Sequence, residues 1–124
     1  MDALKNLEVW RRACRFSADV YRLLENCTNF GYRDQLGRSA LSVASNIAEG
    51  YGREATRERT YLLRIAKGSC AEAWTQLLIG IEAGFIAKNA GFPLTEEADQ
   101  ISRMIFGLIA HFEQDQREIL GPRP

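Results

Sequence analysis

The first 92 residues of this 124-residue chain contain no proline. A proline inside a helix costs roughly 3 kcal/mol, so a long stretch without one leaves extended helices open to the chain. The three prolines that do occur, Pro93, Pro122 and Pro124, all lie in the last third of the sequence. We therefore expect an all-α protein built from long helices.

Apolar side chains recur at spacings of three and four residues in four long segments, as they do in helices with a buried face. The segments cover about residues 7–24, 33–49, 56–83 and 95–120. The connections between them are mostly short, which favours antiparallel neighbours. The sequence thus predicts an antiparallel up-and-down four-helix bundle, with residues 1–124 forming a single domain.

Residues with special backbone preferences predict where these helices begin and end. Thr56 and Thr95 are the expected N-caps of the third and fourth helices. The run Gly50-Tyr51-Gly52 is expected to end the second helix and Gly84 the third, since glycine is the usual residue where a helix ends in a left-handed turn. An extension of the third helix by one turn, through residues 85–87, is the alternative. The third segment carries apolar residues on more than one face, so we expect it to pack on two sides.

The composition excludes several classes of protein. No apolar run approaches the ~18–20 residues that a membrane-spanning helix needs, and no secretory leader is recognisable. Three widely separated cysteines, Cys14, Cys27 and Cys70, predict neither a disulfide framework nor a zinc site. Buried free thiols and a cytoplasmic location are the expectations that follow.

The sequence contains almost none of the residue patterns that are typical of enzyme active sites. The single histidine, His111, has no second histidine or cysteine placed to share a metal. Glycine-rich phosphate loops and the Glu-x-x-His pairs of di-metal bundles are also missing. We expect no enzymatic activity, no metal and no cofactor.

One segment, residues 35–52, combines an apolar stripe with a line of polar residues at helical spacing. The segment after residue 67 carries a comparable line that includes Gly68. Short polar side chains have poorer helix propensity than the residues usual on solvated helices, so their presence needs a reason. We call these residues the polar seam: Gln35, Arg38, Ser42, Asn46, Glu49, Ser69 and Glu72.

Two interpretations of the polar seam are open. In the first, it is a hydrogen-bonded contact where two helices meet closely, within one subunit or between subunits. An unpartnered buried polar group costs roughly 1–3 kcal/mol, so Asn46 and Glu49 must then be paired or exposed. In the second, Arg38, Asn46 and Glu49 line a ligand cleft or an active site. The missing catalytic constellation favours packing or assembly.

The seam also carries a resemblance to a known family. Gln35-Leu36, Arg38 and Ser42, followed by the run from Ser45 to Gly50, resemble the small proteins encoded in intervening sequences of bacterial 23S rRNA genes (S23-like proteins). Further matches are the residues Leu7, Glu8, Val9, Trp10, Tyr21, Ala66, Gly68, Ser69 and Glu72. The sequence departs from the family pattern at Gly37 and Ala44.

This resemblance carries its own expectations. It implies a four-helix bundle that assembles as a homopentameric ring and has no established enzymatic activity. The chain is also similar to the accessory variability determinant of diversity-generating retroelements, a bundle that binds nucleic acid and a reverse transcriptase. The resemblance therefore implies partners of three kinds: further copies of the chain, RNA or DNA, and another protein such as a reverse transcriptase.

The charge is unevenly distributed along the chain. Sixteen basic and sixteen acidic residues cancel in total, but residues 1–67 hold twelve basic and eight acidic ones, a balance of +4. Residues 68–124 hold four basic and eight acidic ones, a balance of −4. Basic residues share a face of the first predicted helix and a face of the third, and they are our candidates for phosphate contacts: Arg11, Arg15, Arg22, Arg57, Arg64 and Lys67.

These observations predict a non-enzymatic, oligomeric bundle that acts as a nucleic-acid-binding scaffold or accessory protein. Tyr32, Tyr51 and Tyr61 lie near basic positions and are candidates for stacking on bases. The alternative is a protein-interaction module or self-assembling structural protein without nucleic-acid binding. In that case the arginines pair with carboxylates of the same chain or of a neighbour.

Overall fold

The computed structural model describes residues 1–121 and contains no strand within them, which confirms the predicted all-α class. Its helices are α1 (Asp2–Lys5), α2 (Glu8–Leu23), α3 (Phe30–Tyr51), α4 (Thr56–Ala83) and α5 (Lys88–Leu120). The four long helices correspond to the four predicted segments. The short α1 was not predicted, and Pro122 and Pro124 lie outside the described residues.

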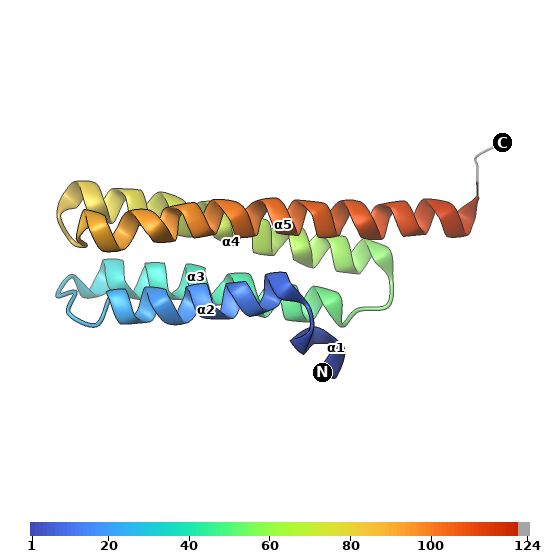
Figure 1. Cartoon of the computed structure of the whole chain (residues 1–124), viewed down its shortest axis with the longest axis horizontal. Helices are drawn as coiled ribbons and strands as arrows, with labels where there is room; N and C mark the ends of the chain where they lie inside the picture. Colours follow the sequence, from blue (N-terminus) through green and yellow to red (C-terminus); the bar gives the residue numbers. More distant parts are fainter. Residues whose placement is uncertain (122–124) are drawn as a thin grey trace.

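The four long helices run antiparallel in the order of the chain (Figure 1). Each packs on its neighbours in sequence, and α5 returns to pack on α2. The helices α2 and α4 are therefore diagonal to one another across the bundle. The C-terminal part of α5, coloured red, extends past the loop that joins α3 to α4 (Figure 1).

Each long helix contributes one stripe of large apolar side chains to a common core. Removing such a side chain from water is worth about 1.5–3 kcal/mol, so these stripes set the rotation of every helix about its axis. The largest fully buried side chains come from all four helices and from the end of α2: Phe16, Val20, Leu24, Leu36, Val43, Ile47, Leu63, Cys70, Leu77, Ile101 and Ile105.

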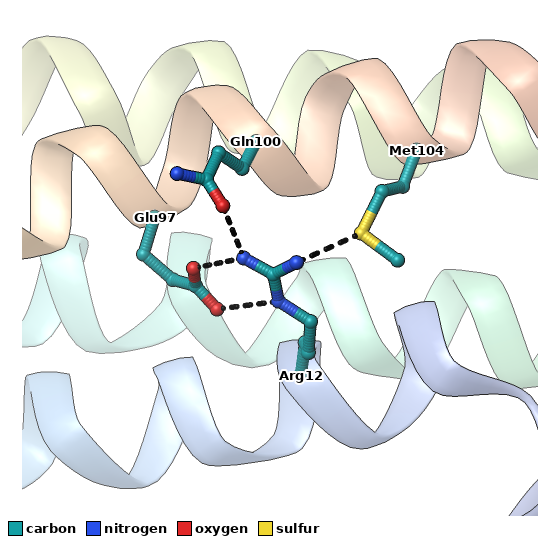
Figure 2. A network of polar contacts seen from close by, with 4 residues as sticks. All are labelled: Arg12, Glu97, Gln100 and Met104. Carbon is teal, nitrogen blue, oxygen red and sulfur yellow. Dashed lines mark hydrogen bonds and ion pairs between the residues drawn. The ribbon is translucent and has the colours of Figure 1, made fainter.

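A half-buried polar cluster joins α2 to α5 (Figure 2). The Arg12 guanidinium donates two hydrogen bonds to the Glu97 carboxylate, of which the Nε–Oε2 bond is 3.0 Å long. It also donates to Gln100 Oε1 at 2.6 Å and to Met104 Sδ at 3.4 Å. The hydrogen bond to Glu97 is the main cause that raises the pKa of Arg12 above its ordinary value. These hydrogen bonds from one guanidinium fix the position of α2 along the axis of α5.

The helix ends agree with the sequence in part. Asn29 caps α3, its side-chain oxygen accepting from Tyr32 N at 3.1 Å, so this helix begins three residues before the predicted start. Gly84 ends α4 in the left-handed conformation, as predicted, with φ of 79°. Gly52 has φ of −78°, so the expected left-handed turn after α3 is wrong. The chain instead leaves α3 with a right-handed C-cap.

Both predicted threonine N-caps are wrong. Ala55 occupies the N-cap position of α4, and the Thr56 hydroxyl donates to Gln116 Oε1 at 3.0 Å. Thr95 is the eighth residue of α5, and its buried hydroxyl donates to Phe92 O at 2.7 Å. The helix α5 begins at Lys88 and runs through Pro93. Pro93 has no backbone N–H and therefore removes one hydrogen bond from the helix. Packing nevertheless favours the helical conformation of the residues before it.

That packing is visible at Gly91, one turn before Thr95 on the buried face of α5. A Cβ at Gly91 would lie 2.8 Å from the end of the Ile81 side chain, so α5 begins in close contact with α4. Leu94 on the same face is buried as well. The burial of Gly91 and Leu94 against the bundle explains why the helix begins before the proline.

The three cysteines are free, as expected, and they lie inside the bundle to different degrees. Cys70 is 1% exposed, and its burial raises the pKa of the thiol to about 12. Cys14 is half-buried, and desolvation raises its pKa above the ordinary value. Thiols held in the protonated form are poor nucleophiles, so these residues act as small core side chains.

Candidate nucleic-acid interface

Three of the predicted phosphate contacts lie along one side of α4. Arg57 lies two turns before Arg64, and Lys67 lies one turn after it, so the three residues share one side of the helix. Arg57 is exposed, and Arg64 forms an ion pair with Glu113 of α5. The Lys67 ammonium lies 5.9 Å from the centre of the Phe106 ring. The structure therefore brings Arg64 and Lys67 together beside α5, whereas Arg57 is exposed two turns earlier on the same helix.

The other three candidates lie on α2. Arg11 donates to Lys5 O at 3.0 Å, Arg22 forms an ion pair with Asp19 at 2.9 Å, and Arg15 is exposed. Because α2 and α4 are diagonal in the bundle, the two basic sets face different sides of the molecule. This separation of the two basic faces follows from the up-and-down order of the helices, and not from the spacing of the basic residues along each helix.

The middle of the polar seam is a hydrogen-bonded connection between α3 and α4. Ser42 Oγ lies 2.9 Å from Ser69 Oγ, and Ser69 Oγ donates to Ile65 O at 3.1 Å. Asn46 Nδ2 donates to Ser42 Oγ and to Ser42 O, each at 2.9 Å. Since a hydroxyl donates one hydrogen, the only consistent direction runs from Asn46 through Ser42 and Ser69 to Ile65 O.

The rest of the polar seam opens to solvent. A groove of about 330 Å³ between α3 and α4 is lined by Gln35, Arg38, Ser39, Ser42, Glu72 and Gln76. Ser39 Oγ donates to Gln35 O at 3.0 Å, with Glu72 Oε2 more distant at 3.4 Å. Gln76 Oε1 is buried and has no hydrogen-bond partner among the described residues.

Glu49 does not share a site with Arg38. It is exposed and pairs with Arg53, just past the end of α3, at 3.3 Å. The groove that Arg38 lines does not include Glu49. The two side chains are eleven residues apart on one helix, a rise of about 16 Å at 1.5 Å per residue. This geometry does not assemble the acid and the cation that an active site at these residues would need.

The predicted stacking tyrosines differ in exposure. Tyr32 packs against Phe85 with ring centres 5.1 Å apart, and Tyr51 packs against Phe112 at 6.3 Å. Both rings are half-buried and are occupied by these contacts. Tyr61 is 64% exposed on the outward face of α4. Of the three, only Tyr61 presents its ring to solvent.

The sequence analysis missed Phe106, the aromatic side chain beside Lys67. Phe106 is 63% exposed, although it follows Ile105, which is fully buried. The exposure of Phe106 could have been predicted from helical periodicity, because Ile105 and Ile109 share the buried stripe and residue 106 lies about 100° from Ile105 around the helix axis. Consecutive apolar residues in a helix cannot all face the core.

Two glycines of α3 mark close helix contacts. A Cβ at Gly50 would lie 3.0 Å from Arg59 O and 3.1 Å from Leu62 Cβ, so α3 and α4 meet backbone to backbone at this point. A Cβ at Gly37 would lie 3.0 Å from the Tyr21 ring. The space that a longer side chain would take at position 37 is therefore filled by Tyr21 of α2.

A metal-binding cluster and a membrane-spanning helix are both absent from the part of the chain that the structure describes. Within residues 1–121, no three His, Cys, Asp or Glu side chains gather closely enough to ligate a metal ion. No helix of that part combines the length and the apolar composition that crossing a bilayer requires.

Comparisons with known proteins agree with the fold. A family model described as 23S rRNA-intervening sequence protein matches residues 5–107. A solved protein of unknown function from the S23 ribosomal protein family of Bacteroides thetaiotaomicron VPI-5482 matches with a TM-score of 0.76 and 20% identity, over 82% of this chain and 97% of that one. No curated protein matches the chain. The family match covers α2, α3 and α4 entirely, and the chain belongs to the 23S rRNA-intervening sequence protein family.

Proposed function

We propose that this protein is a non-enzymatic, self-assembling four-helix bundle that binds RNA or DNA as a scaffold or accessory protein. The observation that carries the proposal is the basic side of α4, where Arg57, Arg64 and Lys67 lie within three turns of the helix. Binding through these residues is directed at phosphates, so it has low sequence specificity and falls steeply with salt. Repetition of the same side in every subunit of a ring multiplies its field.

Self-assembly is supported by the outward face of α4. Six exposed residues follow one another at spacings that alternate between four and three, the spacing of a helix that packs on another helix. Three of the six are large apolar residues, exposed by 64%, 37% and 53% in the single chain. We call these residues the outward stripe: Tyr61, Ile65, Gly68, Glu72, Thr75 and Ile79.

Nucleic-acid binding is tested by fluorescence anisotropy with a structured RNA, a single-stranded DNA and a DNA duplex. We expect affinity at low salt, with a slope of log K against log salt of about −0.9 for each phosphate contacted on a duplex. Arg57→Glu should weaken binding about fivefold or more and reduce this slope. Lys88→Glu is the matched control, because it makes the same charge change at the first residue of α5.

Two results contradict this part of the proposal. One is an absence of binding to all three nucleic acids at low salt. The other is an equal loss of affinity in Arg57→Glu and Lys88→Glu, which would mean that only total charge matters. A partner that stays bound at high salt would favour the alternative function, a protein-interaction module whose partners are other copies or another protein such as a reverse transcriptase.

Self-assembly is tested by light scattering coupled to size exclusion. The homopentamer expected from the family resemblance has a mass five times the 14.0 kDa of the chain. Ile65→Lys places a charge in the outward stripe and should lower this mass, whereas Ile119→Lys changes an 80% exposed residue near the end of α5 and should leave it unchanged. A monomeric wild type would refute the self-assembly.

A further inference from the structure

Phe106 is exposed on α5 at a position where the core does not need it. Its ring is 63% exposed, while Ile105 and Ile109 on either side of it in sequence are buried and hold α5 against the bundle. An aromatic side chain is costly to leave in water, since it carries a large apolar area. Phe106 therefore contributes little to folding of the single chain and is available to a ligand.

The ring stands at the edge of a groove between α4 and α5. This groove has a volume of about 510 Å³, within the range of small-molecule sites. Gly68, Ala71 and Ala110 line it, so the space beside Phe106 is bounded by small side chains. A Cβ at Gly68 would meet no atom within 4 Å. The groove is therefore open beside the Phe106 ring, with free space above Gly68.

The charges around this groove favour an anion. Arg64 and Lys67 line it from α4, and Glu113 lines it from α5. Glu113 is already engaged by two arginines, since it pairs with Arg64 and lies 3.9 Å from Arg117. Of the three charged side chains that line the groove, two are cations, and the one carboxylate is already paired with Arg64 and Arg117. The Lys67 ammonium lies 5.9 Å from the centre of the Phe106 ring, so a charge and a stacking surface are adjacent.

An exposed aromatic ring beside cations, above a floor of small residues, is the arrangement with which proteins hold single-stranded nucleic acids. We propose that the groove between α4 and α5 binds an unpaired base of single-stranded RNA or DNA, stacked on Phe106, with the neighbouring phosphates on Lys67 and Arg64. The proposal rests on the proposed nucleic-acid binding and adds a preference for single strands. A duplex offers phosphates to the same cations but keeps its bases stacked inside the helix.

The test compares two labelled strands of equal length, an oligothymidylate and an oligomer of abasic deoxyribose phosphate. Both strands present the same phosphates, but only the first presents bases. We expect the wild type to bind the oligothymidylate about tenfold more tightly or better, because stacking on an aromatic side chain is worth that much or more for each base. Phe106→Ala should remove this difference, and Phe106→Trp should keep it.

Phe30→Ala is the matched control, because Phe30 is 67% exposed at the first residue of α3 and lies outside the groove. It should leave both affinities unchanged. If the wild type binds both strands equally, the stacking proposal fails while phosphate binding stands. If it binds neither strand, the proposed function fails as well. If Phe106→Ala changes the mass in light scattering and weakens both strands alike, Phe106 belongs to a subunit contact and the proposal is overturned.

Discussion

Gly80 makes room for a tyrosine of the neighbouring helix, and filling that room is a direct test of how α3 packs on α4. A Cβ at position 80 would lie 2.5 Å from Tyr32 Cζ and closer still to the hydroxyl oxygen. The ring cannot easily move away. Its hydroxyl donates to Gln76 O at 2.7 Å, and its face packs on Phe85. Gly80→Ala must therefore displace the whole side chain.

The expected cost follows from three contributions. Alanine in a helix interior gains about 1 kcal/mol over glycine. Losing the hydrogen bond from Tyr32 costs about 1–3 kcal/mol if the displaced hydroxyl finds no other acceptor, and forcing the ring out of its site costs about 1–3 kcal/mol more. Burial raises the pKa of Tyr32 to about 12, so its hydroxyl is protonated and donating at neutral pH. We expect a net loss of about 3 kcal/mol in the free energy of unfolding.

Urea denaturation followed by circular dichroism measures this loss. The matched control is Gly68→Ala, in the same helix, where the added Cβ meets nothing within 4 Å and should stabilise the protein by about 0.4–1 kcal/mol. In a Tyr32→Leu background the penalty of Gly80→Ala should largely disappear, because the obstructing ring is gone. If Gly80→Ala and Gly68→Ala have the same effect, or if the two changes at Gly80 and Tyr32 are additive, the reasoning is wrong.

Three further changes test other parts of the bundle. Ser17 Oγ is buried without a hydrogen-bond partner among the described residues, so Ser17→Ala should raise the free energy of unfolding by about 1 kcal/mol; a lower melting temperature would contradict this. Arg12→Ala should cost about 1–3 kcal/mol in urea denaturation, because it leaves Glu97 half-buried without its donor, and adding Glu97→Gln should recover part of that loss. The pKa of Cys70 is raised from 9.0 to about 12, so unfolded chains lose this proton first and stability should fall by about 1 kcal/mol per pH unit between those values. Cys70→Ala should make this fall shallower in denaturation curves at alkaline pH, and an unchanged slope would assign it to other groups.

Helical periodicity predicted the four long helices because each one buries a single stripe of the core. The predicted ends were less accurate because they depend on neighbours. Pro93 and Thr95 together resemble a helix start in sequence, but the turn before them is held by the contact of Gly91 with Ile81 of α4. Gly84 was predicted correctly because its left-handed conformation is a local property of the chain.

The candidate interface shows the same division between local and distant information. The spacing of Arg57, Arg64 and Lys67 places them on one face of α4 in any fold that keeps this helix. Whether they join the basic face of α2 depends on which helices are diagonal, which the local sequence pattern does not encode. The groove beside Phe106 depends likewise on the way α5 packs against α4.

The polar seam and the outward stripe adjoin one another on α4, and their chemistry separates their roles. The hydroxyls of Ser42 and Ser69 and the amide of Asn46 already form a directed chain that ends on a backbone oxygen, so a partner gains little by offering them hydrogen bonds. The exposed apolar residues of the outward stripe have no such partner in the single chain. In the proposed assembly, contacts between copies would therefore draw their free energy from burial of the outward stripe, while the seam holds α3 and α4 in the register that shapes it.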